Sequence, residues 1–216
     1  MRLSRKNITD YLTFKGVNKV VKVLIFSDVL MMGSFGLITP VFAVYITQTI
    51  TGGTVEVVGI ASTIYLLTKS LGQLFAAEIV DRIKGERDDF WSMFIGSLVM
   101  CAVYALYLVI DAPWQLYAVQ FLNGLATAFT FPSWMGIFTR HVDKDHEGKE
   151  WGMYFTTVDL STAATAAIGG VIAYTLGFKP LFIAIVVIGV LSSLLLLTIK
   201  DEMRMPKKKE IRHRVK

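Results

Sequence analysis

Apolar residues fill six long stretches of the chain, separated by short polar segments. The stretches cover residues 20–47, 57–80, 90–110, 114–138, 151–176 and 181–199. A helix needs about 20 mostly apolar residues to cross a bilayer, and each stretch meets or nearly meets that length. The pattern therefore predicts an all-α membrane protein with six transmembrane helices.

The stretch 114–138 carries polar and aromatic side chains at steps of three and four residues. They are Gln120, Asn123, Thr127, Thr130 and Trp134. This spacing places them on one face of a helix, and a polar face inside lipid must meet protein or water. Interhelical hydrogen bonding is one interpretation. Five such residues on one face favour a second interpretation, in which they form the wall of a cavity. Phe35 and Thr39 of the first stretch are expected to line the same cavity.

The remaining stretches differ in polarity. The stretch 151–176 has a small, polar face formed by Gly152, Thr156, Asp159, Ala163, Ala166 and Gly170. Small residues allow another helix to approach closely. The stretches 90–110 and 181–199 contain no ionisable residue and are expected to face lipid.

Three ionisable residues lie well inside the predicted helices, away from their ends: Asp28, Lys69 and Asp159. Intramembrane charges are costly and commonly mark a path for an ion, a proton or a substrate. At 1.5 Å per residue all three lie roughly 10–16 Å from the same end of the bundle, so they could cluster. The alternative is that a Lys–Asp pair only fixes helix packing, or that Asp28 is solvated near the interface.

Lys and Arg avoid every second connection between the stretches, apart from Lys179. Short loops rich in Lys and Arg stay on the cytoplasmic side. We therefore expect a basic cytoplasmic segment at 1–19, a transmembrane domain at 20–199 and a basic cytoplasmic tail at 200–216, in a multi-pass protein of the cell membrane. The hydrophobic fraction of 54% and the net charge of +5 agree with this topology.

Several function classes lack support in the sequence. The basic tail has no interleaved aromatic residues, which argues against nucleic-acid binding. No catalytic motif is present, so an enzyme is not expected. The single Cys101 offers no disulfide, no spacing for a metal site or cofactor appears, and His141, His146 and His213 are expected to be solvated loop residues.

The chain divides near Asp111 into two units of three stretches. The first stretch of each unit contains a proline, the second an ionisable residue, and the third neither. Because each unit has an odd number of spans, the second is inverted relative to the first. Inverted repeats are typical of transporters.

Four motifs resemble those of the major facilitator superfamily. Residues 77–87 are similar to its GxxxDRxGRR loop, with Asp81 and Arg82 matching. Residues 120–124 resemble its RxxQG pattern, with Gln120 in place of Arg. The pair Gly169–Gly170 and residues 177–182 resemble its patterns at the fifth and sixth spans. Over essentially all of its length the chain resembles the amino-terminal half of such a transporter.

The resemblance implies a transporter half that works by alternating access. Members of the superfamily usually have twelve spans, so we expect a second copy of this chain, or a second half-transporter, across the second and fifth spans. The alternative is that the sequence is a truncated product. Asp28, Lys69 and Asp159 would carry coupling charge, with a proton as the expected ion. A small organic solute would bind at the cavity residues named above, and Asp81, Arg82 and Arg87 would form a cytoplasmic gate. The alternative is a membrane scaffold that grips a partner protein and transports nothing itself.

Overall fold

The apolar stretches fold as long helices, and no strand occurs in the part of the chain that the structure describes. This computed structural model describes Phe14, residues 16–82 and residues 85–203. The α-helices are α2 (Lys19–Gly36), α3 (Phe42–Thr49), α4 (Val55–Arg82), α5 (Arg87–Leu106), α6 (Pro113–His141), α7 (Glu147–Leu176) and α8 (Phe178–Leu196). The all-α prediction is confirmed. Most of the expected basic segments, and His213, lie outside the described residues.

Five helical stretches are long and apolar enough to cross a membrane: Lys19–Thr49, Val55–Val80, Arg87–Leu106, Glu147–Leu176 and Phe178–Glu202. Helix α6 has 29 residues, so its length suffices. Its polar stripe lowers its mean hydropathy, and the sixth span stays a prediction.

The first stretch is interrupted near its middle. Pro40 lies in a short 3₁₀ helix, η1 (Thr39–Val41), between α2 and α3. Proline has no N–H to donate and clashes with the preceding turn, so α2 ends before it. The Thr39 hydroxyl donates to the Phe35 carbonyl over 2.8 Å, and the backbone N–H of Ile38 donates to the same carbonyl over 3.2 Å.

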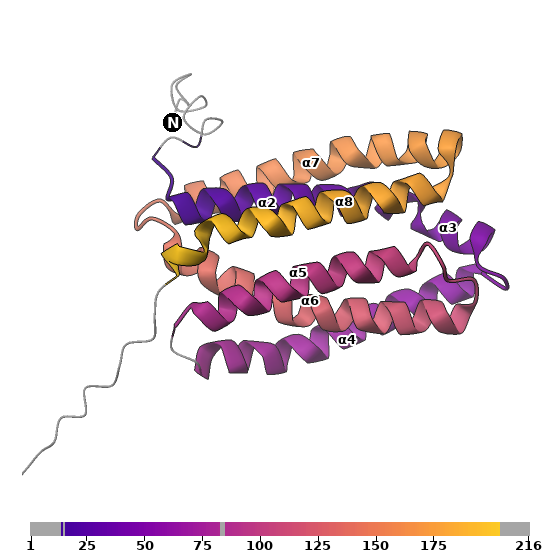
Figure 1. The fold of residues 1–216 in the computed structure, drawn as a ribbon, viewed down its shortest axis with the longest axis horizontal. Coiled ribbons are helices and arrows are strands. Elements are labelled where there is room, and N and C mark those ends of the chain that lie inside the picture. Colours follow the sequence, from indigo (N-terminus) through magenta and orange to yellow (C-terminus); the bar gives the residue numbers. More distant parts are fainter. Residues whose placement is uncertain (1–13, 15, 83–84, 204–216) are drawn as a thin grey trace, which may run out of the picture.

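The helices pack as two sets joined through α5 and α8 (Figure 1). Helix α2 packs on α7 and α8, whereas α6 packs on α4 and α5. The expectation for 90–110 and 181–199 was wrong in part. Each of α5 and α8 has an apolar outer face, but the inner faces pack on each other, as where Gly189 meets Cys101.

The most exposed helices are α4 and α7. Only 6% of the apolar window of each is buried, against 39% for α5 and for α8. In Figure 1 they lie at opposite edges of the bundle. Long apolar helices with so little cover need lipid or another protein surface around them.

Glycines set how closely the helices approach. A methyl group on Gly169 of α7 would fall on the carbonyl of Leu37, and one on Gly124 of α6 would lie 2.7 Å from the carbonyl of Tyr65. Each contact is backbone against backbone, so neither position has room for a side chain.

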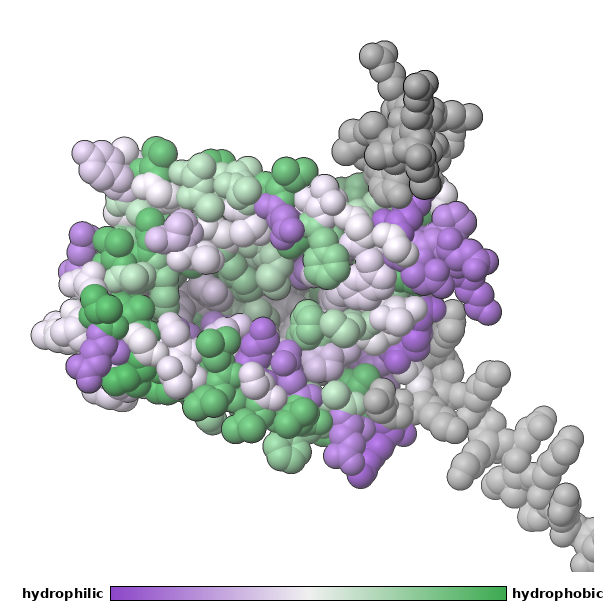
Figure 2. Space-filling model, turned by 180° about the vertical axis from the view of Figure 1, so that it is seen from behind, coloured by the Kyte–Doolittle hydropathy of each residue, from purple (hydrophilic) through white to green (hydrophobic). Residues whose placement is uncertain are grey.

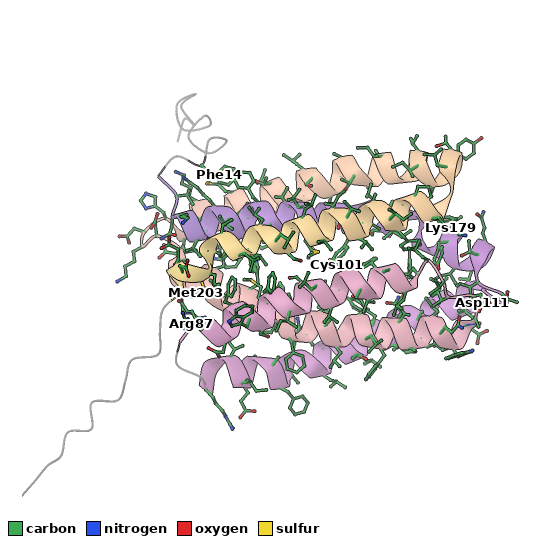
Figure 3. The ribbon with its side chains drawn as sticks, viewed as in Figure 1. Phe14, Arg87, Cys101, Asp111, Lys179 and Met203 are labelled. Carbon is green, nitrogen blue, oxygen red and sulfur yellow. The ribbon has the colours of Figure 1, made fainter. Side chains whose placement is uncertain are left out.

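Two apolar clusters fill the ends of the bundle. One contains Leu24, Phe90 and Phe138, and the other contains Tyr45, Leu116 and Phe182. Figure 3 shows Phe14, Arg87 and Met203 at one end, and Asp111 and Lys179 at the other. We call the end that carries Arg87 the basic end, because Arg82, Arg140 and Lys200 belong to the same helix ends and turns.

Candidate functional site

A cavity of about 560 Å³ lies between the two apolar clusters. Residues of α2, α4, α5 and α6 form most of its lining, which also includes Tyr154 of α7 and Ser192 of α8. Figure 2 shows a hollow in the middle of the rear face, between the α7 side above and the α4 side below. The cavity therefore opens on the side where α4 and α7 have least cover.

The structure brings nine of the predicted site residues to this cavity. They are Asp28, Phe35, Thr39, Lys69, Gln120, Asn123, Thr127, Thr130 and Trp134. Asp159 is not among the lining residues: it lies exposed on the outer face of α7. The small face predicted on this stretch turns outward with it, and the opposite face, with Ser161 and Thr165, packs on α2.

Asp28 is held by a tyrosine from another helix. The Tyr154 hydroxyl donates a hydrogen bond of 2.6 Å to Asp28 Oδ2. Tyr154 is buried, and its ring lies 4.7 Å from that of Trp134, centroid to centroid. Sequence reasoning missed Tyr154. The available signal was a tyrosine inside an apolar helix, because a buried tyrosine hydroxyl needs a polar partner.

Lys69 lies on another wall of the cavity, among different neighbours. Its Nζ atom is 5.9 Å from the ring centroid of Tyr65 and 5.9 Å from that of Phe131. Within the described residues no carboxylate forms an ion pair with it, so Asp28 and Lys69 are not paired with each other. Rings at this distance attract a cation weakly and do not neutralise it.

The residues of the polar stripe on α6 differ in whether their polar atoms have hydrogen-bond partners. The hydroxyls of Thr127 and Thr130 donate to carbonyls of their own helix, each over 2.8 Å. Asn123 Oδ1 and Trp134 Nε1 are buried and have no hydrogen-bond partner within the described residues. Buried polar atoms without partners are uncommon, and at the wall of a cavity they indicate places where a ligand or water would bind.

The basic end differs from the predicted gate. Arg82 pairs with Glu78 on the same exposed helix end, Arg87 is exposed, and the side chain of Asp81 lies outside what the structure describes. Ion pairs between elements are formed by Arg140 of α6, with Asp89 and, over 3.2 Å, with Glu86, and by the exposed Lys19 of α2, with Glu202 over 2.9 Å.

The prediction of a solvated His141 was wrong. This side chain is buried, its Nδ1 lies 3.1 Å from the Ile137 carbonyl, and its Nε2 lies 3.7 Å from Glu86. From the sequence, the charged residues of this connection were interpreted only as signals of membrane topology. The packing of the 85–90 segment on the end of α6 turns them into a buried contact. No group of three His, Cys, Asp or Glu side chains that could hold a metal occurs within the described residues.

Comparison with known proteins agrees with this architecture. The sequence model of the Major Facilitator Superfamily matches residues 24–215. The fold is similar to that of a solved protein described as the POT family transporter PepTSo, with a TM-score of 0.70 and 15% sequence identity, over 88% of this chain and 39% of that one. No curated protein sequence matches the chain. With most of its length covered by the family model, the chain belongs to the Major Facilitator Superfamily.

Proposed function

We propose that this chain is one six-helix half of a secondary active transporter that moves a small organic solute by alternating access. The observation that carries the proposal is the central cavity, with Asp28 and Lys69 in its wall and its open side between α4 and α7. Intramembrane ionisable residues in a cavity are typical of transport paths. The basic end faces the cytoplasm in this proposal, because Lys and Arg gather there.

The six helices form two inverted repeats in this proposal. The packing supports it: the first helix of each unit packs on the second and third helices of the other unit, α2 on α7 and α8, and α6 on α4 and α5. Such an exchange is expected when two similar three-helix units face each other in opposite directions.

A second six-helix unit closes the open side of the cavity. The low cover of α4 and α7 supports this, as does the likeness to a solved transporter of which this chain covers 39%. In the simplest arrangement that unit is a second copy of the chain. Asp159, exposed on α7, then faces the partner, and its predicted coupling role becomes a charge contact across the interface. Counting chains per particle in lipid discs tests the arrangement: one chain per particle would contradict the pairing of two copies.

Asp28 carries the coupling proton. A carboxyl group can take up and release a proton, and Tyr154 holds this one in a fixed position at the cavity wall. Arg82 and Arg87 lie exposed at the basic end, where, together with Asp81, they could contact the second unit as a gate.

Water access to α6 tests the proposal against a scaffold that only binds a partner protein. In a transporter, cysteines introduced at Thr127 and Thr130 face the cavity and should react with water-soluble thiol reagents. A cysteine at Leu125, which is exposed and absent from the cavity lining, is the matched control. Protection of both cavity positions would contradict transport through this cavity and favour the scaffold.

A further inference from the structure

The cavity contains a basic group that forms no ion pair within the described residues. Lys69 is partly buried and meets aromatic rings rather than a carboxylate. The other ionisable group in the lining, Asp28, takes its hydrogen bond from Tyr154 on a different wall. A cation in a membrane interior that no counter-charge contacts is costly. This arrangement therefore favours a ligand that brings a negative charge.

Two buried polar atoms at the cavity wall lack hydrogen-bond partners, so a ligand that binds both must offer one donor and one acceptor. Asn123 is 7% exposed and Trp134 is 5% exposed, and Asn123 Oδ1 and Trp134 Nε1 have no partner within the described residues. The first can accept a hydrogen bond and the second can donate one. Asn123 lies near Lys69, because a methyl group on the adjacent Gly124 would be 3.2 Å from the Lys69 backbone nitrogen.

The remainder of the lining is apolar and adaptable. The rings of Phe35 and Tyr104 stack with their centroids 4.5 Å apart. Four methionines also line the cavity: Met31, Met32, Met93 and Met100. Methionine side chains are flexible and polarizable, and adapt to differently shaped apolar ligands. The volume of about 560 Å³ falls within the range usual for small-molecule sites.

We propose that the solute is an organic anion: a small carboxylate with an apolar body and, beside the carboxylate, a hydroxyl or N–H group. This inference rests on the proposed transport function. The carboxylate pairs with Lys69, the donor group binds Asn123 Oδ1, and the apolar body lies against Phe35 and the methionines.

The charges also explain why solute and proton would move together. The empty cavity, with ionised Asp28 and Lys69, carries no net charge, and neither does the cavity that holds both an anion and a proton. With the anion alone or the proton alone, one uncompensated charge remains. Since an uncompensated charge is costly inside the membrane, both loading events are favoured together.

Matched probes test the charge class. The chain in lipid nanodiscs is titrated by calorimetry with phenylacetate, its amide phenylacetamide, the cation phenethylammonium, and mandelate, which adds a hydroxyl beside the carboxylate. We expect phenylacetate to bind about tenfold or more tightly than the amide and the cation, as is typical of a charge-assisted hydrogen bond. Mandelate should bind more tightly than phenylacetate, and Asn123→Ala should remove that difference.

Variants of Lys69 test whether the preference for the carboxylate depends on this side chain. Lys69→Gln should abolish the preference for the carboxylate, and Lys69→Arg should retain most of it. Lys179→Gln, at an exposed position in the first turn of α8, is the control and should change nothing. Equal binding of the amide, tighter binding of the cation, no carboxylate binding, or a preference that survives Lys69→Gln would overturn the proposal.

The thiol-accessibility experiment at Thr127 distinguishes failure of the anion proposal from failure of the proposed transport function. An accessible Thr127 position combined with no carboxylate preference would leave transport standing and refute the anion. An inaccessible position would refute both.

Discussion

Each wall of the cavity carries one ionisable side chain, and the two side chains have different neighbours. On the α2–α7 wall, Asp28 receives a hydrogen bond from the buried Tyr154 hydroxyl. On the α4–α6 wall, Lys69 lies near two aromatic rings and has no ion-pair partner within the described residues. A group that is already bound can change its protonation in place, whereas an unpaired cation can accept a ligand. The difference suggests that proton and solute use separate walls of one cavity.

The largest expected effect is on the α2–α7 wall. Asp28→Asn keeps the shape of the side chain and a hydrogen-bonding oxygen but removes the titrating group. We expect it to abolish proton coupling while leaving expression intact, as measured by uptake into proteoliposomes with and without a pH gradient. The exposed turn variant Asp111→Asn is the control. Unchanged pH-dependent uptake in Asp28→Asn would refute the assignment of the coupling proton.

Glycine substitutions compare how rigidly the walls are built. In Gly169→Ala the new methyl group would meet the Leu37 backbone, so we expect a loss of about 1–3 kcal/mol in stability, as in other overpacked sites. Gly124→Ala should lose less, because its nearest atoms lie 2.7 Å or more away.

Gly170→Ala is the matched control, since nothing lies within 4 Å of its added methyl group. Thermal melting in detergent gives the ranking. Equal melting temperatures for Gly169→Ala and Gly170→Ala would show that α2 and α7 can separate at little cost.

At the basic end, Arg140 anchors α6 to the start of α5. Arg140→Gln leaves the buried carboxylates of Glu86 and Asp89 without their arginine. Losing a hydrogen-bond partner costs a buried polar group about 1–3 kcal/mol, and a charged group more. Arg82→Gln breaks an exposed pair, which is worth at most about 1 kcal/mol. Chemical denaturation of the two variants should separate them in this order, and the reverse order would contradict the anchoring role of Arg140.

On the α2–α7 wall, a small effect is expected from Tyr154→Phe. This variant removes the hydroxyl that binds Asp28 and keeps the ring that packs on Trp134. The loss of one hydrogen bond should cost about 0.5–1.5 kcal/mol, and proton-coupled uptake should slow without being lost. A complete loss of coupling would mean that the tyrosine itself takes part in proton transfer.

Helical periodicity was enough to identify many of the cavity residues. Gln120, Asn123 and Trp134 share a face in any α-helix, because steps of three and four residues return to the same side. An apolar helix with a polar stripe must turn that stripe away from lipid, so the sequence also determined that the stripe faces inward. The length of the apolar stretches likewise determined the all-helical class.

Only the tertiary structure decided what each side chain meets. The rotation of α7 about its axis is set by close contacts such as Gly169 on Leu37, and that rotation brings Tyr154 to Asp28 while turning Asp159 outward. The same holds at the basic end, where Arg140 and His141 gain carboxylate neighbours from a segment about 50 residues earlier in the chain. Local spacing determines which residues of one helix share a face, but the partner of that face depends on packing between helices far apart in sequence.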